Sequence, residues 1–399
     1  MTDSPTSETA PLDDDVELRE ARRYGRVTLQ LALADMALDF AFLLVFALWI
    51  ARPLDAWLTG FSLLAGQTLW ARIIRLAAFL CVNLAVHVAV SIGLSFYRGY
   101  LVEHRFGLSN QSLARWGSQY AKGIGVGLAA NLVLFAGLYW IMAVCGAWWW
   151  IAAAVAAFVL SVGIGMAAPV LLLPLFIKYE PLDDPALQEE LEKLAEGTGL
   201  SIEGTYRLQL SADTKKANAM LAGLGKTRRI LLGDTLLADF SVEEIKVVMA
   251  HELGHHVFRH ISKMLLLAIP YLFISFWLFD QTLARWIGPD YDPATFPVYG
   301  AAMLMLLVFC LGLVSGPLQN TLMRRFERQC DWYALERTQA VDAYRSAFTK
   351  LCRMNKTDPD PHWLEVLLLD DHPPIVERLR MADDFVGAMH TRRSARDVE

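Results

Sequence analysis

Residues 241–260 read SVEEIKVVMAHELGHHVFRH, and this polar segment passes directly into an apolar run at 262–284. Ser241 followed by Glu244 is the pattern of a capping box, so we predict that a helix begins there. The apolar run is long enough to cross a lipid bilayer. The fold is therefore expected to place a capped, soluble helix next to a membrane span.

The chain is too apolar to be an ordinary soluble protein of its size. Of its 399 residues, 55% are hydrophobic and 20% are charged, and the mean hydropathy is +0.35. We therefore predict a mostly α, polytopic helical membrane protein with about six spans. A weaker stretch at 57–70 is interrupted by glycines and is predicted to be interfacial or re-entrant. The other spans are expected at 28–50, 73–97, 119–143, 146–176 and 297–320.

Hydrophilic sequence divides the chain into five predicted parts. Residues 1–27 are polar, with an acidic run near their start, and are predicted to form a disordered N-terminal tail. Membrane helices follow at 28–177. A membrane helical hairpin at 261–320 separates two hydrophilic segments, 178–260 and 321–399, which we expect to fold together as one α+β domain.

The segment 178–260 contains signals for both helices and strands. An amphipathic helix is predicted at 184–198, strands at 204–210 and 228–233, and the capped helix at 241–260. The strand at 228–233 is expected to offer an edge to which an extended peptide could add.

Charge and cysteine content limit the classes of partner and site. Lys and Arg are more numerous on the side that would hold both termini and the hydrophilic segments, so we expect that side to be cytoplasmic. The formal net charge is −6 and no long basic run occurs, which argues against nucleic acid as a partner. The five cysteines lack C-x-x-C spacing, so they predict neither a disulfide framework nor a thiolate metal site.

The capped helix contains a pair of histidines four residues apart. His251 and His255 belong to the sequence HELGH, and on a helix their imidazoles share a face. They can bind one zinc ion while Glu252 acts as general base on a water molecule. The alternative is a surface helix with scattered histidines, because so short a pattern also arises by chance. For His256 and His260 we expect a solvated or structural role.

A third metal ligand has to come from elsewhere in the chain. The metzincin histidine is excluded, because Phe258 and Ile261 stand where that pattern needs Gly and His. The hairpin at 261–320 returns to the same side of the membrane and delivers Glu327, which we predict as the third ligand. Two histidines and one glutamate leave a position open for water, so we expect one catalytic Zn²⁺ per chain and peptide-bond hydrolysis.

Asp331 lies one helical turn after Glu327. It is suited to accept a hydrogen bond from a ligand histidine and to fix the tautomer of that histidine. A surface ion pair with Arg328 or Arg324 is the alternative for Asp331.

An ordered series of motifs resembles the type I CAAX prenyl endopeptidases, which are integral-membrane zinc proteases. The resemblance runs along most of the chain and is far more specific than HELGH alone. Besides HELGH, it rests on YLVEHRFGLSNQ (100–111), NAMLAGLGK (218–226), RILLGDTLL (229–237), FERQCD (326–331) and HPPIVERL (372–379).

The resemblance implies roles for three further residues. Asn218 would bind the substrate backbone or stabilise the oxyanion, and His372 would assist it from the C-terminal segment. Arg378 would orient the site or contact Asp331 or Glu327. Apart from the resemblance, Asn218 is typical of a turn and His372 of a loop before a helix.

The family also implies that the spans enclose a water-filled chamber. This chain shows six predicted spans where the family typically has seven. Polar residues inside the predicted spans fit a wet interior, although hydrogen bonds among themselves in a dry bundle are the alternative. These residues are Asp35, Asp39, Asn83, His87 and Asn131.

The expected protein is thus an integral, multi-pass membrane protein with a gluzincin-like α+β zinc protease domain on the cytoplasmic side. Its substrates would be peptides or proteins in the lipid bilayer, either prenylated proteins that lose their C-terminal tripeptide or membrane-stalled proteins. In a bacterium we expect the inner membrane and the second kind of substrate. The sequence leaves two other hypotheses: a site-2-type intramembrane protease, and a transporter or membrane chaperone whose structural zinc has His256 or His372 as fourth ligand.

Overall fold

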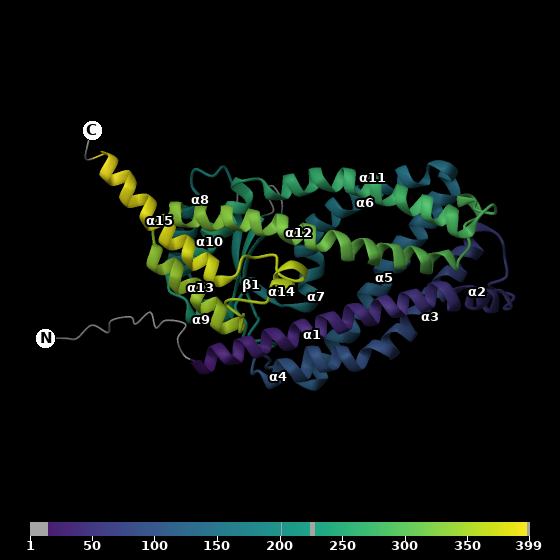
Figure 1. The fold of residues 1–399 in the computed structure, drawn as a ribbon, viewed down its shortest axis with the longest axis horizontal. Helices are drawn as coiled ribbons and strands as arrows, with labels where there is room; N and C mark the ends of the chain where they lie inside the picture. Colours follow the sequence, from purple (N-terminus) through teal and green to yellow (C-terminus); the bar gives the residue numbers. More distant parts are fainter. Residues whose placement is uncertain (1–14, 201, 224–227, 397–399) are drawn as a thin grey trace.

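Long helices run along the length of the molecule, and a small sheet with shorter helices lies at one end (Figure 1). The structure is a computed structural model that describes residues 15–200, 202–223 and 228–396. The long helices are α1 (Asp15–Val45), α3 (Leu69–Phe96), α5 (Leu113–Cys145), α6 (Trp149–Ala167), α11 (His260–Ile287) and α12 (Gly300–Thr338).

Among the described residues, five continuous helical segments are long and apolar enough to cross a membrane. One of them, Leu113–Ala167, contains both α5 and α6. At 1.5 Å per residue a straight helix of this length would be about 80 Å long, far more than a bilayer core of about 30 Å. Instead α5 ends at Cys145, Gly146 takes φ 52°, and α6 packs back against α5. This segment therefore supplies two of the six predicted spans.

The N-terminal tail predicted for 1–27 is wrong from Asp15 onward, because α1 begins there. Residues before Asp15 lie outside the described part of the chain. The part of α1 that lies within the predicted tail contacts distant residues, and sequence periodicity does not reveal these contacts. Tyr24 donates a hydrogen bond to Glu103 over 2.5 Å and packs its ring edge-on against Phe106 at 5.1 Å. These contacts give the first turns of α1 a packed surface in place of solvent.

Short elements connect the long helices. The stretch predicted to be interfacial, 57–70, forms the end of α2, the turn after it and the start of α3, at the far end of the molecule from the sheet (Figure 1). Buried apolar residues from the long helices and from their connections form the core at this end, with Phe79 and Trp149 fully enclosed. The connecting helices are α2 (Ala51–Thr59), α4 (Glu103–Arg105) and α7 (Leu173–Phe176).

In the part of the chain that the structure describes, the sheet has four strands in the order β1-β2-β4-β3. They are β1 (Tyr179–Pro181), β2 (Ile202–Leu208), β3 (Ala219–Ala222) and β4 (Arg228–Gly233). β4 pairs in parallel with β2 and antiparallel with β3, so it lies inside the sheet. The prediction of a free edge at 228–233 is therefore wrong, and β3 forms the outer edge on that side of β4. The sequence pattern marked β4 as a strand but not the short neighbour that covers it.

Helices surround the sheet and supply the second core. Buried residues from the sheet and from α8, α9, α10 and α12 meet there, among them Leu191, Leu232 and Leu253. The predicted capping box is present, since Ser241 N donates to Glu244 Oε2 over 2.7 Å and Glu244 N donates to Ser241 Oγ over 3.3 Å. The helices here are α8 (Pro185–Ala195), α9 (Asp234–Asp239), α10 (Val242–Val257), α13 (Val341–Asn355), α14 (Trp363–Leu368) and α15 (Ile375–Arg396).

Candidate metal centre

Two helices bring the candidate ligands together. α10 carries His251 and His255, and the part of α12 beyond the predicted span packs against it. The contact is close because α10 has Gly254 there: a Cβ at that position would lie 3.1 Å from Cys330 Cα. The small residue inside HELGH therefore lets α12 approach, which sets Glu327 opposite the two histidines.

Three side chains converge on one point. His251 Nε2 lies 3.0 Å from Glu327 Oε2, and His255 Nε2 lies 3.2 Å from Glu327 Oε1. Glu327 is only 2% exposed, yet its Oε2 receives no hydrogen bond from any residue that the structure describes. A buried carboxylate oxygen without a donor, facing two imidazole nitrogens, fits a divalent cation with nitrogen and oxygen ligands.

On the side of its ring away from Glu327, His251 contacts the buried ion pair of Asp331 and Arg378. His251 Nδ1 donates to Asp331 Oδ1 over 2.9 Å, and Arg378 Nε donates to Asp331 Oδ2 over 2.9 Å. Asp331 is completely buried, and the alternative of a surface ion pair with Arg328 or Arg324 is not what the structure has. Arg328 pairs with another acid, Glu377, and Arg324 donates to backbone carbonyls.

These contacts also set the protonation of His251. Burial alone would lower its pKa, but the hydrogen bond to Asp331 and the Glu327 carboxylate, 3.0 Å from Nε2, outweigh burial and raise the pKa to about 9. A metal at Nε2 would replace a proton on that nitrogen.

The candidate catalytic residues line a cavity of about 530 Å³ beside this centre. Glu252 faces the cavity from α10. Asn218, the residue just before β3, also faces the cavity. His372 lies in the loop before α15, with Nε2 3.2 Å from Glu327 Oε2 and Nδ1 2.6 Å from Asp371 Oδ1. The structure thus gathers all eight candidate residues around one place: seven line the cavity, and Asp331 lies behind His251.

The edge of the sheet that β3 forms borders the same cavity. Ala219 and Met220 of β3 line it together with Ala217 and Asn218. Asn355 accepts a hydrogen bond from Ala217 N over 2.9 Å and donates one to Ala217 O over 3.3 Å, which fixes the approach to the strand. An extended peptide paired with β3 would therefore run past the candidate centre.

Of the two candidate fourth ligands, His372 approaches Glu327 Oε2 to 3.2 Å but does not complete a four-residue cluster with both ligand histidines. Among the described residues, the atoms within 4.8 Å of one another here come from His251, His255 and Glu327, and His372 is not in that group. His256 lines a different cavity together with Arg228. Three protein ligands leave room for water, as in catalytic sites.

His260 was assigned no part in the site from the sequence. It is 2% exposed, so the solvated alternative is wrong for this residue. Its ring contacts His255, and its own partner is Gln329 of α12. The only sequence signal was its position five residues after His255, which is not a spacing that one helix face predicts.

Two family models together cover most of the chain. The model of peptidase family M48 matches residues 181–386, which contain all eight candidate residues. The model described as CAAX prenyl protease N-terminal, five membrane helices, matches residues 2–178.

Individual relatives give the same result. The chain is 30% identical to the CAAX prenyl protease 1 homolog of Arabidopsis thaliana, covering 81% of this chain and 73% of the relative. It is 25% identical to CAAX prenyl protease 1 of Saccharomyces cerevisiae over 93% of this chain and 86% of that protein. It is 24% identical to the uncharacterized metalloprotease YhfN of Bacillus subtilis over 92% of this chain and 85% of that protein.

A solved structure shares the fold. The crystal structure of S. mikatae Ste24p superimposes with a TM-score of 0.78 and 24% sequence identity, covering 93% of this chain and 89% of that one. Both the membrane helices and the soluble domain therefore follow a known arrangement.

Proposed function

Since the chain belongs to peptidase family M48 and is an integral-membrane metalloendopeptidase, we propose that His251, His255 and Glu327 hold one zinc ion per chain. The observation that carries this proposal is the convergence of the two Nε2 atoms on the buried carboxylate of Glu327, at 3.0 and 3.2 Å. When bound, zinc polarises the scissile carbonyl and makes a nearby water molecule more acidic.

Glu252 is the proposed general base. It lies on α10 beside both histidines and faces the cavity, where it takes a proton from the attacking water and later delivers it to the leaving amine. Asp331 and Arg378 act through His251 by holding its Nδ1 proton, so that Nε2 faces the metal position.

Asn218 and His372 are the proposed donors to the oxyanion. Both line the cavity, Asn218 from the segment before β3 and His372 from the loop before α15. A donor of this kind stabilises the transition state by about 3 kcal/mol in comparable enzymes. The substrate strand would pair with the free edge of β3, which brings its scissile bond between these donors and Glu252.

The proposed substrates are peptides that are associated with the membrane. The membrane-capable segment Gly300–Thr338 carries Glu327 to the cavity, so we expect a substrate anchored in lipid to reach the site. The relatives are named CAAX prenyl proteases, which favours prenylated proteins, and we propose that these lose their C-terminal tripeptide. Membrane-stalled proteins are the second candidate class. We further propose that the zinc site faces the cytoplasm, which in a bacterium places the protein in the inner membrane.

The other hypotheses have less support. A transporter or chaperone with a structural zinc would need a fourth protein ligand, and His372 is not in the converging set. A site-2-type intramembrane protease would carry HELGH within an apolar span, whereas α10 is a capped helix of the soluble domain and precedes α11.

Cleavage of two peptides tests the proposal. The purified, detergent-solubilised protein is given a farnesylated CAAX peptide and its unprenylated twin, beside the Glu252→Gln variant. Cleavage of the farnesylated peptide alone, lost in the variant, supports a prenyl-directed protease. Equal cleavage of both supports the quality-control role, and metal binding without Glu252-dependent cleavage of either would contradict the catalytic assignment.

A further inference from the structure

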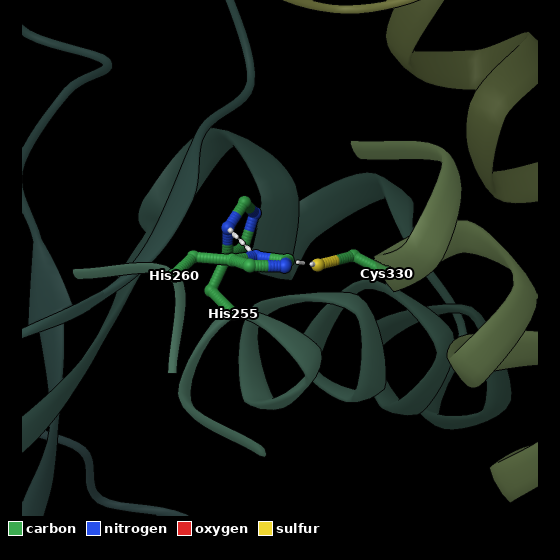
Figure 2. Close-up of side chains that lie close together, drawn as sticks. All are labelled: His255, His260 and Cys330. Carbon is green, nitrogen blue, oxygen red and sulfur yellow. Dashed lines mark hydrogen bonds between the residues drawn. The ribbon is translucent and has the colours of Figure 1, made fainter. Parts of the chain in front are cut away.

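His260 contacts His255 of α10, although His260 itself belongs to α11. Arg259, between α10 and α11, takes φ 55° and ψ 40°, and this left-handed residue turns the chain so that His260 starts α11 beside His255. Figure 2 shows the two imidazoles and the thiol of Cys330 close together. This turn is unusual for a residue with a side chain, so the surrounding contacts must hold it.

Three contacts fix the ring of His260. Its Nδ1 lies 3.2 Å from Nδ1 of His255, and its Nε2 lies 3.0 Å from Oε1 of Gln329 (the former contact is drawn in Figure 2). Its face stacks on Phe326 with a centroid distance of 4.1 Å and an interplanar angle of 8°. The ring therefore has one orientation, with one nitrogen toward α10 and the other toward α12.

The chain of contacts determines where each proton lies. An amide oxygen only accepts hydrogen bonds, so His260 Nε2 carries a proton and donates it to Gln329 Oε1. A neutral imidazole has one N–H, which leaves His260 Nδ1 as an acceptor. The proton between the two rings then belongs to His255 Nδ1, and His255 Nε2 keeps a lone pair toward Glu327, 3.2 Å away.

We propose that His260 and Gln329 are positioning residues that hold the proton on His255 Nδ1 and so present His255 Nε2 to the metal. The inference rests on the proposed function, in which His255 is a ligand. The two ligand histidines are then oriented by different chemistry. His251 donates to the charged carboxylate of Asp331, whereas His255 donates to a neutral imidazole that is itself held by an amide.

A second metal site is the competing explanation for this cluster. Nitrogens of His255 and His260 and the sulfur of Cys330 lie within 4.8 Å of one another. Cys330 Sγ is 3.7 Å from the same His260 Nδ1 that faces His255. A metal among these atoms would take both Nδ1 lone pairs, which is incompatible with a proton shared between them.

Zinc affinity separates the two explanations. Chelator-buffered zinc titration of the full-length protein in detergent gives both the number of ions per chain and the dissociation constant. His260→Phe keeps a ring to stack on Phe326 but removes both nitrogens. His260→Asn places an amide oxygen near the position of Nδ1 and restores the acceptor. His256→Phe, on α10 next to His255, is the matched control.

Wild-type protein should bind one zinc ion, and His260→Phe should weaken binding by about 10- to 100-fold, as loss of an outer partner of a ligand histidine does. His260→Asn should recover most of the affinity, and His256→Phe should bind as wild type does. The metal-free unfolding temperature of His260→Phe should stay near that of wild type, which shows that the fold is intact.

Wild-type affinity in His260→Phe would overturn the inference while leaving the proposed function standing. Two zinc ions per wild-type chain, one of them lost in both His260→Phe and Cys330→Ala, would overturn it in favour of a second metal site. If wild-type protein binds no zinc, or if binding survives His251→Ala, the proposed function fails together with the inference.

Discussion

Arg378 Nε donates a hydrogen bond to Asp331 Oδ2 over 2.9 Å, and both side chains are buried behind His251. The guanidinium also stacks over the ring of Phe348, with Cζ 3.7 Å from the ring centroid. Through this contact α15 reaches the Asp331 carboxylate of α12, which orients the candidate ligand His251. The C-terminal helix is consequently part of the site although it supplies no ligand.

Replacing this arginine should destabilise the fold. Arg378→Met leaves the Asp331 carboxylate buried without its cation, which costs about 3–5 kcal/mol when one partner of a buried pair is removed. We expect a clearly lower unfolding temperature by differential scanning fluorimetry in detergent. Arg380→Met, an exposed position on the same helix, is the control. Unchanged unfolding of Arg378→Met would show that the ion pair has no structural role.

A methyl group at Gly254 should separate the two helices of the centre. Its Cβ would meet Cys330 Cα at 3.1 Å and Cys330 Sγ at 3.2 Å, so Gly254→Ala forces α10 and α12 apart. Overpacking of this kind costs about 1–3 kcal/mol. Because Glu327 moves with α12, we also expect weaker zinc binding.

The matched change is Gly312→Ala, which lies on α12 with open space around the new Cβ. It should leave zinc affinity as in wild type. Equal zinc affinity in Gly254→Ala and Gly312→Ala would contradict the view that close helix packing sets the ligand geometry.

Glu244 should make stability depend on pH. Burial alone would raise its pKa, but hydrogen bonds from Lys350, Ser346 and Ser241 N outweigh burial and hold the pKa below its usual value. A lowered folded-state pKa adds stability above the unfolded-state pKa of about 4.3, and that stability is lost as the pH falls through the folded value.

Glu244→Gln should therefore be less stable than wild type near neutral pH, by about 1 kcal/mol from the capping interaction alone. The difference should shrink as the pH is lowered below about 4.3. Urea unfolding from pH 3 to 8 measures it, with exposed Glu243→Gln as the control. A difference that is constant with pH would exclude an ionised Glu244 as its source.

Removing the amide of Asn218 should slow catalysis without removing the metal. If the amide stabilises the oxyanion, Asn218→Ala should lower kcat by about 10²- to 10³-fold, with KM changed little. Bound zinc per chain should equal that of wild type, since Asn218 is not one of the three proposed ligands. A raised KM at wild-type kcat would instead assign Asn218 to substrate binding alone.

Local sequence patterns predicted the parts of the structure that depend on one helix or one strand. Ser241 and Glu244 identified the cap, and the spacing of His251 and His255 identified a shared helix face. These features follow from helix geometry, in which positions three and four apart are neighbours. The apolar runs likewise predicted the long helices, because bilayer thickness sets their length.

Features that depend on distant contacts were missed. β4 was recognised as a strand, but its neighbour β3 has only four residues and too little pattern to show that it covers the edge. The start of α1 is polar, and its packing depends on contacts with distant residues, among them Glu103, Phe106 and Lys356. His260 reaches His255 through a left-handed turn at Arg259, which helical spacing does not predict.

Metal content and activity measured together test the central claim most directly. Zinc per chain and Glu252-dependent peptide cleavage are determined for wild-type protein and for Glu327→Ala, with Arg325→Ala as a control on the same helix. The account predicts one zinc ion and cleavage in wild type and in the control, and loss of both in Glu327→Ala. Full zinc occupancy and cleavage in Glu327→Ala would contradict a centre built from His251, His255 and Glu327.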